Sequence, residues 1–170
     1  MWKSALVFVA TLLLALTLAP SRAHAWGSPR NGFGLGIGSG TGTPLGVSGK
    51  LMAGPGAFQG VVGFWGSGEG FHQYGHIDGL ALSLDYLFEM PTLVSSPYFN
   101  IDWDFGFGGG VGIPTGGGDV GIGVAGIAGL EFNFTRAPVD VALEYRPSVG
   151  LVPGVGLALV GFTAHVRLWF

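Results

Sequence analysis

An eight-stranded antiparallel transmembrane β-barrel behind an N-terminal signal peptide is the all-β fold that the sequence predicts. Three observations predict it: a short apolar leader, an unusual glycine content, and stretches in which apolar and polar residues alternate. The chain has 34 glycines in 170 residues, and each glycine inside a helix costs about 1 kcal/mol relative to alanine. Alternation with a period of two gives a strand one apolar and one polar face.

Composition excludes several other classes of protein. The formal net charge is −3, so the chain lacks the basic surplus of a nucleic-acid-binding protein. A hydrophobic content of 48% is too high for a disordered chain. The glycines follow no triplet period, which excludes collagen. Because there is no cysteine, a disulfide scaffold, a cysteine zinc site and an N-terminal lipoprotein anchor are also excluded.

The N-terminal residues have the three parts of a secretory signal peptide. Lys3 gives a basic start, the run from Ala5 to Leu18 is apolar except for two threonines, and Ala23-His24-Ala25 forms a small-residue cleavage site. The apolar run has about 14 residues, whereas a helix that spans a bilayer needs about 20. We therefore expect residues 1–25 to be removed and residues 26–170 to form one outer-membrane barrel domain.

Four strands are predicted before residue 90, and each has apolar residues on its outward face. In chain order they are 32–39 with Phe33, Leu35 and Ile37 outward, 45–53 with Leu45, Val47 and Leu51, 57–66 with Phe58, Val62 and Phe64, and 80–88 with Leu80, Leu82, Leu84, Tyr86 and Phe88.

Four further strands follow. The clearest covers 98–107, where five large apolar residues face one way while Asp102 and Asp104 face the other. An apolar face opposite a polar one fits a barrel with lipid outside and a polar lumen. The same alternation predicts strands at 120–134, 139–146 and 162–170.

Eight is the strand count that the chain length favours. Strands of about 10 residues use roughly 80 residues, and single-chain bacterial barrels have even strand numbers. Ten strands remain an alternative if a loop hides a hairpin.

The connections between the predicted strands are expected to differ at the two ends of the barrel. We expect short turns on the periplasmic side, where both termini lie, at 54–56, 89–96 and 135–138. We expect longer outer loops at 39–44, 67–76, 108–119 and 147–155.

Charged residues fall on the inward face of the predicted strands. The interior of an eight-stranded barrel is narrow enough for side chains to fill, and an unpaired buried charge costs several kcal/mol. We therefore predict a salt-bridge network in the half of the lumen nearer the termini; solvated charges in a wet channel are the alternative. The predicted members are Lys50, Asp85, Asp102, Asp104, Glu131, Asp140, Glu144, Arg146 and Arg167.

No catalytic residue, cofactor or metal site is predicted. His165, Ser83 and Asp85 all face inward, but their strands lie across the barrel from each other, and a hydrolytic trio needs direct hydrogen-bond reach. A loop group around His72 and His76 lacks the preset geometry of a zinc site. Inward glycines are instead expected to let a narrow, curved barrel close.

The last strand carries residues that resemble a known signal. Val166, Leu168 and Phe170 look like the C-terminal motif recognised by the barrel-assembly machinery of bacterial outer membranes. With the stretches 34–38, 43–50, 85–88, 137–144 and 151–153, the chain resembles a family of small, glycine-rich outer-membrane β-barrel proteins of unassigned activity. The architecture is similar to OmpA-type barrels. The resemblance implies an integral bacterial outer-membrane protein with periplasmic termini, and it brings no catalytic residues.

Two functions compete most closely. The first is a non-enzymatic cell-envelope protein that supports membrane integrity or makes surface contacts through glycine-rich outer loops. The second is a porin-like narrow pore, made cation-preferring by Asp102 and Asp104. A lipid-modifying enzyme and a soluble carrier are weaker alternatives. Expected partners are outer-membrane lipid, lipopolysaccharide and the assembly machinery, with no nucleic acid and no assigned surface ligand; we expect a monomer.

Overall fold

The computed structural model describes residues 32–41, 43–65 and 79–170. The predicted signal peptide, the predicted loop 67–76 and its histidines lie outside the described residues. The described part of the chain consists of β-strands and their connections. Within it, no helix is long and apolar enough to span a bilayer.

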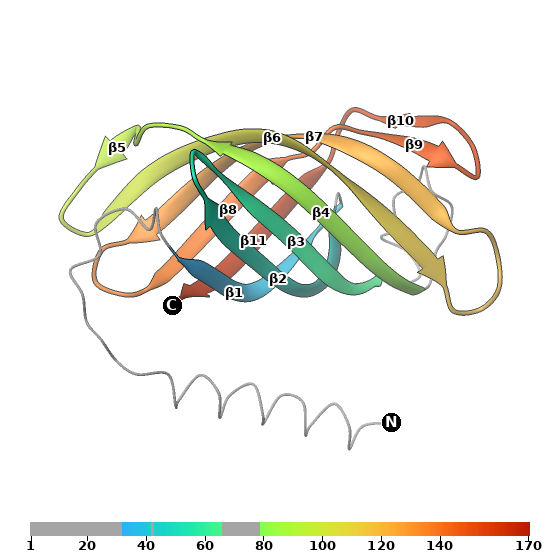
Figure 1. Ribbon diagram of the computed structural model, residues 1–170, viewed down its shortest axis with the longest axis horizontal. Helices are drawn as coiled ribbons and strands as arrows, with labels where there is room; N and C mark the ends of the chain where they lie inside the picture. The colour runs from blue at the N-terminus through green and yellow to red at the C-terminus, as the bar shows by residue number, and fades with distance from the viewer. Residues whose placement is uncertain (1–31, 42, 66–78) are drawn as a thin grey trace, which may run out of the picture.

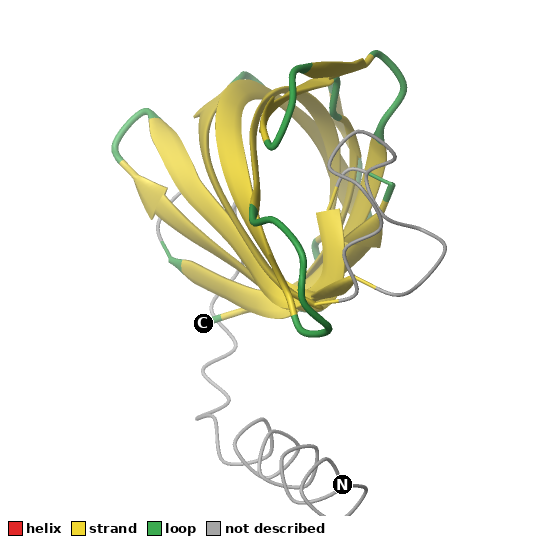
Figure 2. Ribbon diagram, turned by 90° about the vertical axis from the view of Figure 1, so that its right-hand side faces the viewer, coloured by secondary structure: helices red, strands yellow, loops and turns green. Residues whose placement is uncertain are grey.

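Eight strands form a closed antiparallel barrel, which confirms the predicted architecture (Figure 1). Neighbours pair in chain order and the last strand pairs back onto the first, so the ring has no open edge (Figure 2). The barrel strands are β1 (Phe33–Gly40), β2 (Thr43–Ala53), β3 (Gly56–Trp65), β4 (Gly79–Glu89), β6 (Phe99–Pro114), β7 (Gly121–Phe134), β8 (Val139–Tyr145) and β11 (Phe162–Trp169).

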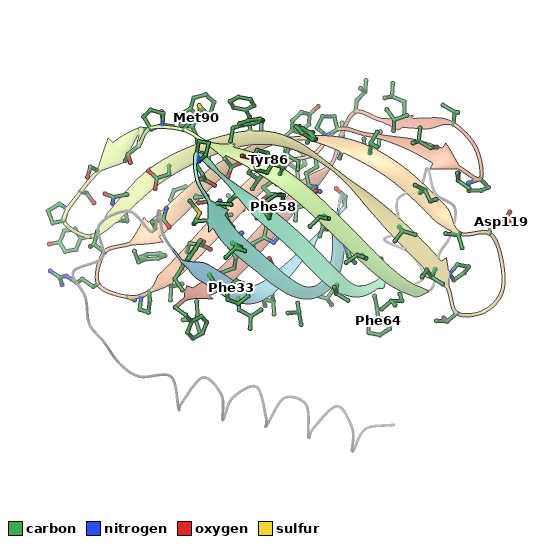
Figure 3. The ribbon with its side chains drawn as sticks, in the orientation of Figure 1. Phe33, Phe58, Phe64, Tyr86, Met90 and Asp119 are labelled. Carbon is green, nitrogen blue, oxygen red and sulfur yellow. The ribbon has the colours of Figure 1, made fainter. Side chains whose placement is uncertain are left out.

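Burial alternates from one residue to the next along the barrel strands. On β4, for example, Leu82 and Leu84 are exposed, whereas Ser83 and Asp85 are buried. Apolar side chains project from the outside of the barrel, as Phe64 does in Figure 3. The distribution is therefore the reverse of that in a soluble protein, with apolar groups outside and polar groups inside.

Strand β6 extends further than the sequence predicted. The expected loop at 108–119 is strand as far as Pro114, which pairs with Gly79 at the start of β4. On its other side, Gly112 of β6 pairs with Gly121 of β7. Three successive glycines conceal this part of the strand because glycine contributes no side chain to the alternation. The long β4 needs a partner over its whole length, and β6 provides it.

The predicted loop at 147–155 contains a hairpin. Its strands are β9 (Ser148–Val152) and β10 (Gly156–Ala158). Strand β9 continues along β7 beyond the end of β8, and β10 pairs with β9. The hairpin lengthens one side of the wall and adds no strand to the ring, so the barrel has eight strands, not ten. The predicted loop at 39–44 is also shorter than expected, since Gly40 pairs with Thr43.

The two ends of the barrel differ. One end, here called the C-terminal rim, carries Phe170 and the turns at 54–55, 90–98 and 135–138 (Figure 1). The predicted turn at 89–96 contains β5 (Val94–Ser95), which pairs with an extension of β6. The other end, the opposite rim, carries the β9–β10 hairpin and the connection at 115–120, where Asp119 lies (Figure 3).

Candidate functional site: a polar network across the lumen

The nine charged residues predicted to face the lumen are all buried. None is more than 5% exposed, although their side chains are among the most strongly hydrated in proteins. They project inward because each occupies the inward position of the strand alternation, which Arg146 continues one residue beyond the end of β8. Ion pairs among the described residues join Lys50, Arg146 and Arg167 to acids on other strands. These residues form a network inside the barrel.

The first group is the Lys50 cluster, which consists of Lys50, Glu89, Asp104 and Glu131. Lys50 Nζ lies 2.6 Å from Glu89 Oε1 and 3.5 Å from Asp104 Oδ2, and it donates a hydrogen bond to Glu131 Oε1. Lys50 stands on β2, whereas the three acids stand on β4, β6 and β7. One ammonium group therefore reaches across the lumen to three carboxylates.

Arg167 connects this cluster to the rest of the lumen. Its Nη2 donates to Glu131 Oε1 at 2.8 Å, and its Nε lies 3.0 Å from Asp140 Oδ1. Asp140 is the direct partner of Arg167 in the β8–β11 register, and it also accepts a 2.7 Å hydrogen bond from Trp169 Nε1. Arg167 Nη1 donates to Gln59 Oε1 on β3. One guanidinium group thus holds side chains from three other strands.

The second group is the Arg146 cluster: Arg146, Asp85 and Glu144. Arg146 forms a two-point contact with Asp85, through hydrogen bonds of 2.9 and 2.8 Å to the two carboxylate oxygens. A third bond of 3.0 Å reaches Glu144. Such paired guanidinium–carboxylate contacts are strong and directional. Gln59 joins the two clusters, since its Nε2 donates to Glu144 Oε1 at 2.7 Å.

Asp102 has a different setting from the other predicted members. Its Oδ2 accepts a 2.8 Å hydrogen bond from Asn133 Nδ2. The two residues belong to β6 and β7, near the C-terminal rim. An amide on the neighbouring strand therefore contributes to holding this carboxylate.

Sequence reasoning missed three members of the network, although the signal for each was present. Glu89 continues the inward alternation of β4 by one position beyond the predicted strand end. Gln59 and Ser48 are inward on strands that were assigned from their outward residues alone. Extending each alternation to the strand end and naming both faces would have found them.

A serine, a histidine and an acid come together in the lumen, but not the trio considered from the sequence. Ser48 Oγ lies 2.9 Å from His165 Nδ1, and His165 Nε2 lies 3.4 Å from Glu144 Oε2. Ser83 Oγ has no hydrogen-bond partner among the described residues. Ser48 and His165 are both 0% exposed. The arrangement places a histidine between a hydroxyl and a carboxylate inside the polar network.

Compared with protein-family models, with curated proteins and with solved structures, the chain matches none. The eight-stranded antiparallel barrel agrees with the OmpA-type architecture that the sequence resemblance implied. The family membership remains an expectation that rests on the sequence motifs. The closed barrel and the buried polar network are therefore the features that bear on the function of the protein.

Proposed function

We propose that the protein is an integral, non-enzymatic outer-membrane barrel with a closed lumen, which supports envelope integrity or makes surface contacts. One observation carries the proposal: apolar side chains cover the outside of a closed barrel, while paired charges fill its inside. A closed barrel satisfies its backbone hydrogen bonds within itself, which is the condition for crossing a bilayer with strands. An apolar exterior then faces lipid.

The exposed apolar surface supports a lipid environment. Phe64, Leu84 and Phe107, from three different strands, are each more than 60% exposed. Soluble monomers rarely expose apolar patches of more than a few hundred Å². A water-soluble carrier would bear this surface at a large cost, and lipid removes that cost. The resemblance to outer-membrane barrels points to the same location.

The two rims support an orientation. The C-terminal rim carries the turns that were expected on the periplasmic side, and the opposite rim carries the β9–β10 hairpin and the 115–120 connection. We propose that the opposite rim faces outward and meets lipopolysaccharide and surface ligands. The final residues Val166, Leu168 and Phe170 then lie at the periplasmic end, where barrel-assembly machinery recognises its substrates.

The ion-paired lumen favours a closed barrel over a pore. Lys50 and Glu131 project from β2 and β7, which are separated by four strand steps in either direction around the ring. Gln59 and Glu144 make a second connection between opposite walls. These four residues are at most 3% exposed, which supports a lumen filled by side chains over a water-filled one. An aqueous pore would solvate the same charges.

Conductance in planar bilayers tests this proposal. The full chain is refolded and inserted, insertion is checked by resistance to alkaline extraction, and a general porin is measured in parallel as the conducting control. We expect stable insertion without channel steps. Reproducible cation-selective steps from the inserted protein would overturn the closed lumen and favour the pore. Complete extraction at alkaline pH would overturn the membrane assignment itself.

A further inference from the structure

The β9–β10 hairpin and the residues next to it, 147–164, expose no polar side chain. This stretch contains no charged residue, and its two hydroxyl side chains, Ser148 and Thr163, are each 3% exposed. Its aliphatic side chains are 40% to 85% exposed at six positions, which are Leu151, Val152, Val155, Leu157, Leu159 and Val160. An exposed apolar patch of this kind marks an interaction surface.

The connection at 115–120 lies at the same rim as the hairpin but has a different composition (Figure 1). All six of its residues are exposed, and they include Thr115, three successive glycines and Asp119. Small and polar residues of this kind are typical of a connection in water. The opposite rim therefore has a polar side at 115–120 and an apolar side at the hairpin.

Strand register connects the hairpin to the outer face of the barrel. Leu84 on β4 pairs with Gly109 on β6, and Gly109 pairs with Val124 on β7. Val124 pairs in turn with Val149 on β9, and Val149 pairs with Leu157 on β10. Leu84, Val124 and Leu157 are 62%, 48% and 60% exposed. One row of the wall therefore extends the apolar outer face from the middle of β4 into the hairpin, with no polar side chain between.

The composition of the hairpin favours lipid over a protein as its partner. Protein interfaces are enriched in Tyr, Trp and Arg at their centres and carry hydrogen bonds throughout. Residues 147–161 contain none of these three residue types, and their exposed side chains have no group that forms a hydrogen bond. The hydroxyl of Tyr145, just before this segment, donates to the Leu159 carbonyl oxygen, so it does not need a water partner. Hydrocarbon is the partner that such a surface fits.

We propose that the outer face of the β9–β10 hairpin binds the acyl chains of membrane lipid, at the boundary between hydrocarbon and headgroups. The inference rests on the proposed membrane location and adds a lipid-contact surface to it. The boundary also suits the backbone, because β10 pairs only with β9 among the described strands. An open strand edge does not occur in the hydrocarbon, whereas headgroups and water can satisfy it. The 115–120 side of the rim then provides the surface contacts.

Fluorescent labels on single cysteines test this inference, because the chain has no cysteine of its own. Leu157→Cys carries an environment-sensitive label on the hairpin, and Gly116→Cys is the matched control on the same rim, where a Cβ would have no neighbour within 4 Å. The full chain is refolded into vesicles of phosphatidylcholine and phosphatidylglycerol, and insertion is checked by alkaline extraction. Fluorescence is then quenched by phosphatidylcholine with a spin label near the head of its acyl chain, or by iodide. Iodide is present on both sides of the membrane, so the direction of insertion does not affect the result.

We expect the spin-labelled lipid to quench Leu157→Cys and iodide to leave it nearly unchanged, with the reverse for Gly116→Cys. Leu151→Cys, on β9, should behave as Leu157→Cys does. If iodide quenches both inserted hairpin variants as strongly as Gly116→Cys, the inference is wrong while the membrane location stands. Protection from both quenchers would also overturn it, because a protein such as a second copy would then cover the hairpin. Extraction of all three variants at alkaline pH would overturn the membrane location together with the inference.

Discussion

Gln59 and Glu144 stand on opposite walls of the barrel, yet Gln59 Nε2 donates a 2.7 Å hydrogen bond to Glu144 Oε1. Their strands, β3 and β8, are separated by four steps in both directions around the ring. Gln59 also accepts a hydrogen bond from Arg167 at its other amide atom. A single neutral side chain therefore joins the Arg146 cluster to the Lys50 side of the network.

Replacing Gln59 by leucine should destabilise the barrel substantially. The change keeps the approximate volume but removes the hydrogen-bond partner of Glu144 Oε1 and of Arg167 Nη1, two buried polar atoms, at a cost of about 3 kcal/mol. Equilibrium urea unfolding in detergent measures the difference in the free energy of unfolding. Ser83→Ala is the control, since this buried hydroxyl has no hydrogen-bond partner among the described residues. If both variants unfold at the same urea concentration, Gln59 does not join the network.

Most of the barrel was predictable because strand alternation is a local property. Apolar and polar residues two apart define the two faces, so the inward position of Asp85 or Arg167 follows from the sequence alone. Such reasoning fails where glycine interrupts the alternation, as in β6 beyond Phe107. It also missed the β9–β10 hairpin, because β9 is held by pairing with β7, a strand that is not adjacent to it in sequence.

The contacts within the network were less predictable than its members. Which side chains meet across a lumen depends on strand tilt and register around the whole ring, and these are long-range properties. The alternation placed Lys50 and Glu131 inside, but it did not indicate that their side chains meet across the lumen. Glu89 was lost for a simpler reason, since the predicted strand ended at residue 88, one position too early.

Gly36 should not tolerate alanine. A Cβ at this position would overlap the Val166 carbonyl oxygen and lie 2.7 Å from Arg167 Cα, both of which belong to the backbone of β11. Strands β1 and β11 close the barrel, so the backbone has little freedom to move away. Overpacking costs about 1–3 kcal/mol and sometimes more. The folded fraction is measured by the mobility shift between unheated and heated samples in gel electrophoresis.

The same substitution at Gly116 serves as the control for Gly36→Ala. A Cβ there would have no neighbour within 4 Å, and the residue lies in the connection at the opposite rim. We expect Gly116→Ala to fold as the unmodified chain does. If Gly36→Ala folds equally well, then the close approach of β1 to β11 does not limit barrel closure.

Arg146 and Asp85 should show strong energetic coupling. Each single variant, Arg146→Met or Asp85→Asn, removes part of a buried two-point ion pair and should cost about 3–5 kcal/mol. The double variant leaves no unpaired partner from this contact, so it should cost about 1–3 kcal/mol less than the sum. A double-mutant cycle from urea unfolding measures the coupling. The control cycle combines Asp85→Asn with Trp169→Phe, because these two residues share no direct partner. Their effects on the free energy of unfolding should add to within about 0.5 kcal/mol. If the effects of Arg146→Met and Asp85→Asn are additive as well, the prediction is wrong.

Trp169 and Phe170 are adjacent in sequence but should differ in what they control. Trp169 is 4% exposed and donates to Asp140, whereas Phe170 is 52% exposed at the C-terminal rim. We expect Trp169→Phe to lower the free energy of unfolding by about 1–2 kcal/mol through the lost hydrogen bond. Phe170→Ala should leave unfolding in detergent nearly unchanged and reduce the amount of barrel inserted into the outer membrane of expressing cells. Normal insertion of Phe170→Ala would show that this residue is not part of an assembly signal, whatever its effect on stability.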